Sequence, residues 1–142
     1  MPFLNAQDSA RVEAAVKAAE ERTTGEIHVH VTAIAPPNKI LERAEALFFE
    51  LGLEKTAARN GVLILIAASD RRFAIWGDKG IHQAAGQPLW DEARVLLESG
   101  LKAGKPGEAL VACVAAVGRA LEKHFPRSDS DKNELPDGVT ES

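Results

Sequence analysis

Residues 60–81, NGVLILIAASDRRFAIWGDKGI, decide the fold because they hold two apolar segments joined by a short charged turn. The pair Asn60-Gly61 is a turn signal, and residues 62–67 form an unbroken aliphatic run of strand length. A strand without polar alternation is usually covered on both of its faces, as the strands of α/β sheets are. The charged turn then reverses the chain and predicts a second strand over 71–76, antiparallel to the first.

Hydrophobic periodicity on either side of this hairpin predicts the remaining elements. Residues 26–32, EIHVHVT, alternate as a strand with one apolar face does. Apolar residues at helical spacing predict helices over 6–22, 40–52 (with Leu41 in its apolar stripe), 88–99 and 106–124, with a connector over 81–86 and a break over 100–104. The helix between strands 26–32 and 62–67 makes a βαβ crossover, so these strands should be parallel. We therefore expect a three-layer α/β/α sandwich around a small mixed β-sheet.

Length and polarity indicate one domain and a tail. A chain of 142 residues suffices for one domain with a substantial core. We place this domain at residues 1–126. Residues 127–142 are acidic and almost without apolar side chains, so we expect a largely disordered or loosely docked tail, for which Leu135-Pro136 is the one candidate anchor.

Charge and composition exclude several classes of protein. The net charge is −4 and Arg71-Arg72 is the only basic pair, which argues against nucleic-acid binding. No apolar run approaches the length that spans a membrane, and the residues after Met1 lack the features of a signal peptide. Cys113 is the single cysteine and lies in an apolar helical run, so we expect it in the core. We expect a cytoplasmic monomer that does not insert into membranes.

Three carboxylates near strand ends are the candidate ligands of a divalent cation: Asp78, Asp70 and Glu26. Asp78 lies between two glycines, which allow the backbone to approach a ligand closely. The alternative is that Asp70 satisfies local amides of a turn and Asp78 lies in a helix-entry loop. Asp70 and Asp78 flank the second strand of the hairpin, which argues against one site built from both. His82 follows this turn and could line the same cleft as Asp78.

Two histidines give a second candidate metal site. Glu26, His28 and His30 lie on one face of the first strand because side chains alternate with period two. Two imidazoles and a carboxylate could hold zinc, but alternate positions on a strand are about 6.5–7 Å apart and a further ligand is needed. A polar strand face partly covered by helix residues is the preferred interpretation.

The sequence contains no familiar catalytic or nucleotide-binding motif. Neither the phosphate-binding P-loop pattern nor the dinucleotide pattern GxGxxG occurs, and no serine lies in an elbow-like motif. What remains is carboxylate chemistry.

Several motifs in their order and spacing resemble the TPM domain family, which is named for a thylakoid lumen protein, a photosystem II repair protein and a worm receptor modulator. The resemblance covers roughly residues 6–126, and the tail resembles that of a short soluble bacterial subgroup. The matching segments are Thr24-Gly25-Glu26-Ile27, Arg59-Asn60-Gly61-Val62-Leu63-Ile64, Asp70-Arg71-Arg72, Ile75-Trp76-Gly77-Asp78-Lys79-Gly80-Ile81, Phe125-Pro126 and Asn133-Glu134-Leu135-Pro136-Asp137.

The resemblance implies an α/β/α sandwich and two kinds of function. Some members are described as acid phosphatases or as calcium or magnesium binders, and others as accessory proteins of membrane complexes. The positions that match the family's acidic loops are Asp70 and Asp78, with Glu26 on the adjoining strand. Our hypothesis is a module that binds Ca²⁺ or Mg²⁺ weakly and engages a protein partner. The alternative is a metal-assisted acid phosphatase (phosphomonoesterase), although the sequence shows no phosphoryl nucleophile with an adjacent base. A scaffold without metal is a third possibility.

Overall fold

The computed structural model describes residues 3–34, 39–127 and 138–141. Within these residues, two helices and two strands first alternate, and a third strand, three helices and a fourth strand follow. They are α1 (Ala6–Glu20), β1 (Glu26–Thr32), α2 (Ile40–Glu50), β2 (Gly61–Ala67), β3 (Arg72–Gly77), α3 (Lys79–Ala85), α4 (Gln87–Lys102), α5 (Pro106–His124) and β4 (Gly138–Glu141), with short 3₁₀ turns η1 (Leu53–Lys55) and η2 (Ala68–Asp70).

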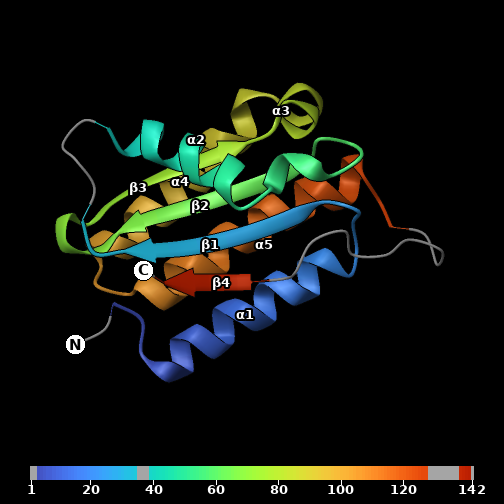
Figure 1. Cartoon of the computed structure of the whole chain (residues 1–142). Helices are drawn as coiled ribbons and strands as arrows, with labels where there is room; N and C mark the ends of the chain where they lie inside the picture. Colours follow the sequence, from blue (N-terminus) through green and yellow to red (C-terminus); the bar gives the residue numbers. More distant parts are fainter. Residues whose placement is uncertain (1–2, 35–38, 128–137, 142) are drawn as a thin grey trace.

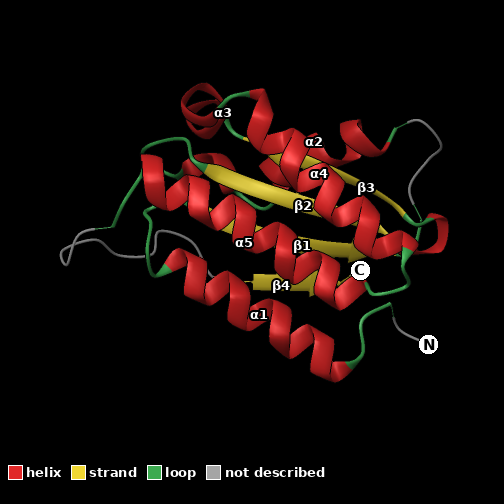
Figure 2. Ribbon diagram, turned by 180° about the vertical axis from the view of Figure 1, so that it is seen from behind, coloured by secondary structure: helices red, strands yellow, loops and turns green. Residues whose placement is uncertain are grey.

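The strands form one mixed sheet in the order β3-β2-β1-β4. β1 is parallel to β2 and to β4, whereas β2 and β3 are antiparallel, which confirms the predicted pairing. Figure 1 shows α2 on one face of the sheet, and Figure 2, seen from behind, shows α1, α4 and α5 on the other. The predicted three-layer α/β/α sandwich is therefore confirmed.

β2 is the centre of the core, and every one of its seven residues is buried. Val62, Ile64 and Ile66 belong to the larger apolar cluster, with α1, α4 and α5. Leu63 and Leu65 point the other way, into the smaller cluster under α2. Because each large aliphatic side chain contributes about 1.5–3 kcal/mol when buried, both faces of this strand favour apolar residues. The unbroken run in the sequence follows from this double coverage.

Two elements differ from the sequence prediction. The expected connector at 81–86 is helical, because Asp78 caps α3 and Gly80 lets that helix lie directly on the Ala58 carbonyl oxygen. The expected break at 100–104 begins too early, since α4 continues to Lys102. Gly100 lies inside α4 and permits close contact with α5, where a Cβ would overlap Ala109. Glycine therefore marks close packing at these positions and does not end a helix.

The apolar stripe of α2 is also narrower than predicted. Leu41 is 55% exposed, while Leu47 and Phe48 are buried under the same helix. Cys113 is buried in α5 as predicted, and burial raises the pKa of its thiol to about 12. No helix in the described segments is both long and apolar enough to cross a membrane.

The fourth strand lies in the segment that the sequence predicts to be a tail. Gly138–Glu141 pairs with β1, and Val139 packs against the larger apolar cluster. For these four residues the structure shows a short strand in the segment that the sequence predicts to be largely disordered or loosely docked. The expected disorder of 128–137, and the expected anchor at Leu135-Pro136, lie outside the described residues. A four-residue strand with one large apolar side chain gives too weak a pattern to be recognised in the sequence.

Candidate functional site

The sheet separates the three predicted cation ligands. Glu26 begins β1, and Asp78 follows the end of the antiparallel strand β3, so both lie at the amino ends of β1 and β2. Asp70 follows β2 at the opposite end. Seven strand residues span about 20 Å, so Asp70 cannot share a cation with the other two. Among the described residues, no group of three or more His, Cys, Asp and Glu side chains could hold a metal ion.

Asp78 is engaged by the protein itself. Its two carboxylate oxygens accept hydrogen bonds from Nε and Nη2 of Arg59, at 2.6 and 2.9 Å, and Oδ1 also accepts from the Lys79 amide at 2.8 Å. The side chain is only 6% exposed. The hydrogen bond that Arg59 donates to Asp78 is the main cause that raises the pKa of Arg59. Asp78 therefore serves as an ion-pair partner and helix cap, and Arg59 is the partner that the sequence analysis missed.

Glu26 belongs to a buried polar cluster at the same end of the sheet. Its amide donates to the Asn60 carbonyl at 3.4 Å, and the Asn60 side chain donates to the Thr24 hydroxyl at 3.0 Å. The Glu20 carboxylate accepts from the Ile27 amide at 2.7 Å. These hydrogen bonds join α1, β1 and the residue before β2. The family motifs around Thr24 and Asn60 therefore have a structural role.

The histidine pair lies on one strand face, as predicted, and contacts β4. Nε2 of His28 and Nδ1 of His30 lie 2.8 and 2.6 Å from the hydroxyl oxygen of Thr140. Both histidines are 8% exposed. Burial lowers the pKa of His28 to about 4, and the neighbouring His30 adds to this lowering. The cluster thus joins β1 to β4.

The stability of the protein should fall in mild acid because of His28. The unfolded state takes up the proton near pH 6.5, whereas the folded state resists it until about pH 4. The unfolded state binds more protons between these values, so the free energy of unfolding decreases as the pH falls through this window. We expect a loss of about 2 kcal/mol, after allowing for screening by solvent. Urea unfolding at pH 7, 5.5 and 4.5 measures it.

The control for this experiment is His28→Gln, which cannot take up the proton. Carboxylates titrate in part of the same window in both proteins, so the difference between the two profiles isolates His28. Parallel profiles for the wild type and the variant would contradict the prediction.

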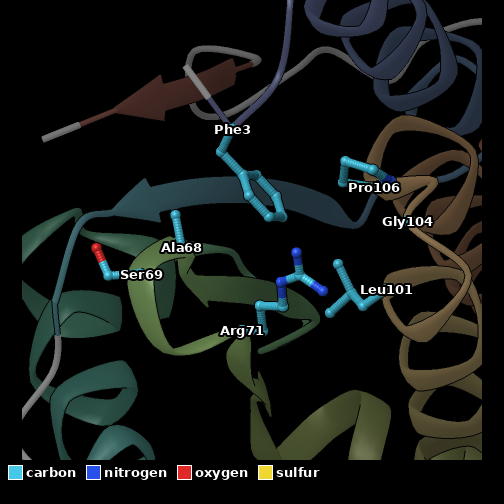
Figure 3. A pocket seen from close by; sticks show the side chains of 7 residues that line it. All are labelled: Phe3, Ala68, Ser69, Arg71, Leu101, Gly104 and Pro106. Carbon is cyan, nitrogen blue, oxygen red and sulfur yellow. The ribbon is translucent and has the colours of Figure 1, made fainter. Parts of the chain in front are cut away.

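A pocket of about 410 Å³ lies at the other end of the sheet, beside the carboxyl end of β2. Figure 3 shows the guanidinium of Arg71 extending between Phe3 and Leu101, with Ser69 and Ala68 on the neighbouring turn. The residues that line this pocket are Phe3, Ala68, Ser69, Arg71, Leu101, Gly104 and Pro106. Ligands of open α/β sheets usually bind at the carboxyl ends of the strands, which makes this pocket the candidate functional site.

The turn η2 positions the polar side chains of this pocket. The Ser69 amide donates to the Ala33 carbonyl at 2.9 Å, which fixes the turn to the chain that leaves β1. Arg71 then adopts a left-handed conformation with φ 52°. This conformation costs a side chain such as arginine about 1–2 kcal/mol and is often found at functional sites.

The electrostatics of the pocket favour an anion. Arg71 forms no ion pair with any carboxylate in the described segments of the chain. Pro106 lines the pocket as the first residue of α5, whose N-terminal end carries a partial positive charge. Asp70 lies in the same turn, between Ser69 and Arg71, and is exposed. Arg71 lines the pocket and lies next to Asp70 in the same family motif, although only Asp70 was singled out from the sequence.

A second cavity, of about 590 Å³, lies beside β3 and includes Asp78 and His82 in its wall. The expectation that these two residues line one cleft is therefore confirmed. Nε1 of Trp90 donates to Nδ1 of His82 at 2.9 Å.

Comparisons with known proteins agree with this architecture. The NMR structure of the BA42 protein from the psychrophilic bacterium Bizionia argentinensis is 34% identical, with a TM-score of 0.91 over 99% of this chain and 97% of that one. The N-terminal domain of the cg2496 protein from Corynebacterium glutamicum is 16% identical, with a TM-score of 0.63 over 95% and 81%, and shows a shared fold alone. No curated protein matches the chain. The sequence profile of the TPM domain matches residues 2–120, and the chain therefore belongs to the TPM domain family.

Proposed function

We propose that this TPM domain is a binding module that takes up a small phosphorylated ligand, together with a divalent cation, in the pocket at the carboxyl end of β2. The observation that carries the proposal is the Arg71 guanidinium, which points into a cavity of about 410 Å³ (Figure 3). A guanidinium presents paired N–H donors that match phosphate oxygens, and such charge-assisted hydrogen bonds are about twice as strong as neutral ones. Ser69 lines the same wall.

Asp70 is the residue that we assign to the cation. Its carboxylate is exposed, and Asp70, which is not itself among the lining residues, lies in sequence between two that are, Ser69 and Arg71. Mg²⁺ usually keeps several waters and binds through one or two carboxylates together with the phosphate oxygens of a ligand. One carboxylate therefore fits a weak Ca²⁺ or Mg²⁺ site that the bound phosphate completes. Asp78 and Glu26 stay predictions as ligands, but the contacts of Asp78 with Arg59 compete with any cation there.

The metal-assisted phosphomonoesterase is the second candidate, favoured by the same pocket. Hydrolysis needs an activated nucleophile, supplied by a side chain beside a base or by a metal-bound water. The Ser69 hydroxyl has no hydrogen bond to a histidine or carboxylate within the described residues. Binding without turnover is therefore the simpler function. A protein partner, a monomeric state and a cytoplasmic location stay predictions, since the pocket bears on none of them.

The proposal predicts different effects for two neighbouring substitutions. Arg71→Ala should weaken the binding of inorganic phosphate about ten-fold, because one charge-assisted contact is worth about 1.5 kcal/mol or more. Asp70→Asn should leave phosphate affinity without metal unchanged, or improve it slightly, but should abolish the gain in affinity that MgCl₂ or CaCl₂ gives. Isothermal titration calorimetry with phosphate, with and without each cation, measures both effects.

Arg94→Ala is the matched control, since Arg94 is an exposed arginine on α4 with its side chain 60% exposed. It should bind phosphate as the wild type does. Equal phosphate affinity in Arg71→Ala and the wild type would refute the pocket. Hydrolysis of p-nitrophenyl phosphate that is lost in Asp70→Asn would instead favour the phosphatase.

A further inference from the structure

The cavity beside β3 is a groove with apolar walls. Two of the exposed large apolar side chains of the described protein, Leu41 (55%) and Phe49 (48%), lie on its α2 side. Trp90 of α4 lines the opposite side, and Trp76 of β3 lies between them. Exposed apolar side chains gathered in one concave surface are typical of a site that another molecule covers.

The floor of this groove is an open sheet edge. β3 is the end strand of the sheet as far as the structure describes it. The Asp78 amide donates to the Gly61 carbonyl at 2.9 Å, and hydrogen-bonded pairs alternate along an antiparallel ladder. Trp76, Ala74 and Arg72 therefore bond to β2, while the N–H and C=O groups of the residues between them point away from it. Such an edge can pair with an added strand.

The charge of the groove indicates what such a strand should carry. Arg59 and Asp78 neutralise each other across their ion pair. Lys79 is exposed at the same end of the groove and forms no ion pair with a carboxylate in the described segments. Its ammonium, on a chain of net charge −4, complements a carboxylate.

We propose that the groove binds an extended segment of a partner protein, which adds to β3 as a fifth strand. The segment has apolar side chains at alternate positions, which contact Leu41 and Phe49, and an acidic side chain near Lys79. Main-chain hydrogen bonds to β3 supply affinity, and the alternating side chains supply specificity. This function is independent of the phosphate pocket and involves a different class of ligand.

A second copy of the chain fits the edge less well. β3 of a second copy, RFAIWG, carries Arg72 as its only charged side chain and therefore offers no carboxylate to Lys79. Charge complementarity thus favours an acidic partner segment over self-association.

A phage-displayed library of random dodecapeptides tests the proposal on the full chain. We expect the enriched peptides to alternate apolar residues and to carry an acidic residue near one end. Leu41→Asp and Lys79→Glu should each weaken the binding of the synthesised peptides more than ten-fold. Val95→Asp is the matched control, since Val95 is 56% exposed on α4 outside the groove, and it should bind as the wild type does.

Backbone N-methylation of the enriched peptides separates strand addition from other modes of binding. Methyl groups on the edge that faces β3 should abolish binding, whereas methyl groups on the opposite edge should leave it intact. The proposal is overturned if no peptide is enriched, if Leu41→Asp binds as tightly as the wild type, or if both methylation patterns act equally. A dimer in sedimentation that Leu41→Asp dissociates would also overturn it, because the second copy would then be the occupant.

Discussion

A chain that ends at Arg127 should melt about 8 °C below the full-length protein. The deletion removes β4, and with it the four-residue ladder on β1 and the packing of Val139 against the larger apolar cluster. It also removes the hydroxyl of Thr140, which lies within hydrogen-bond distance of His28 and His30. A loss of roughly 3 kcal/mol is expected from one partly buried aliphatic side chain and two hydrogen bonds. Thermal unfolding by circular dichroism measures it.

Two further chains show where the loss arises. A chain that ends at Glu141 keeps β4 and should melt within about 1 °C of the full-length protein, since it lacks only one residue beyond the strand. The full-length variant Thr140→Val keeps the strand but removes the hydroxyl, and should lose about 1 kcal/mol. If the chain that ends at Arg127 has the same melting temperature as the full-length protein, β4 does not contribute to stability.

The sequence predicts β2 well because a strand that is buried on both faces requires an unbroken run of apolar residues. Seven consecutive buried positions need apolar residues on both faces, and such a run can be recognised without knowing its neighbours. β4 could not be predicted in this way, because it forms by pairing with β1, which is more than 100 residues earlier in the sequence. Gly100 was misread for a related reason. A glycine that ends a helix and a glycine that allows two helices to touch look the same in a sequence.

The candidate site was only half predictable. Asp70 was singled out because carboxylates near strand ends suggest cation binding, and its neighbours Ser69 and Arg71 line the pocket. Arg71 was missed because its importance comes from a left-handed backbone and from a cavity built by α4, α5 and the chain before α1. Asp78 attracted attention because glycines flank it. The structure gives these glycines another reason: a Cβ on Gly77 would overlap the ring of Trp90, and Gly80 lies on a backbone carbonyl.

Asp78→Asn should destabilise the protein strongly. Asparagine can still cap α3, since Asn and Asp are equally good N-cap residues. It cannot, however, carry the charge that the Arg59 guanidinium contacts through two hydrogen bonds. Removing one partner of this half-buried ion pair leaves the Arg59 guanidinium without its main partner. We expect the melting temperature to fall by more than about 5 °C.

A double-mutant cycle decides whether the ion pair is the cause. Arg59→Gln with Asp78→Asn replaces both charges by amides, so the double variant should be less destabilised than the sum of the single variants. Asp70→Asn is the matched control, because its carboxylate is exposed, and its melting temperature should stay within about 1 °C of the wild type. Additive effects of Arg59→Gln and Asp78→Asn would show that the two side chains act separately. Asp78 would then again be available as a cation ligand, and calcium titration of the single variant would be the next measurement.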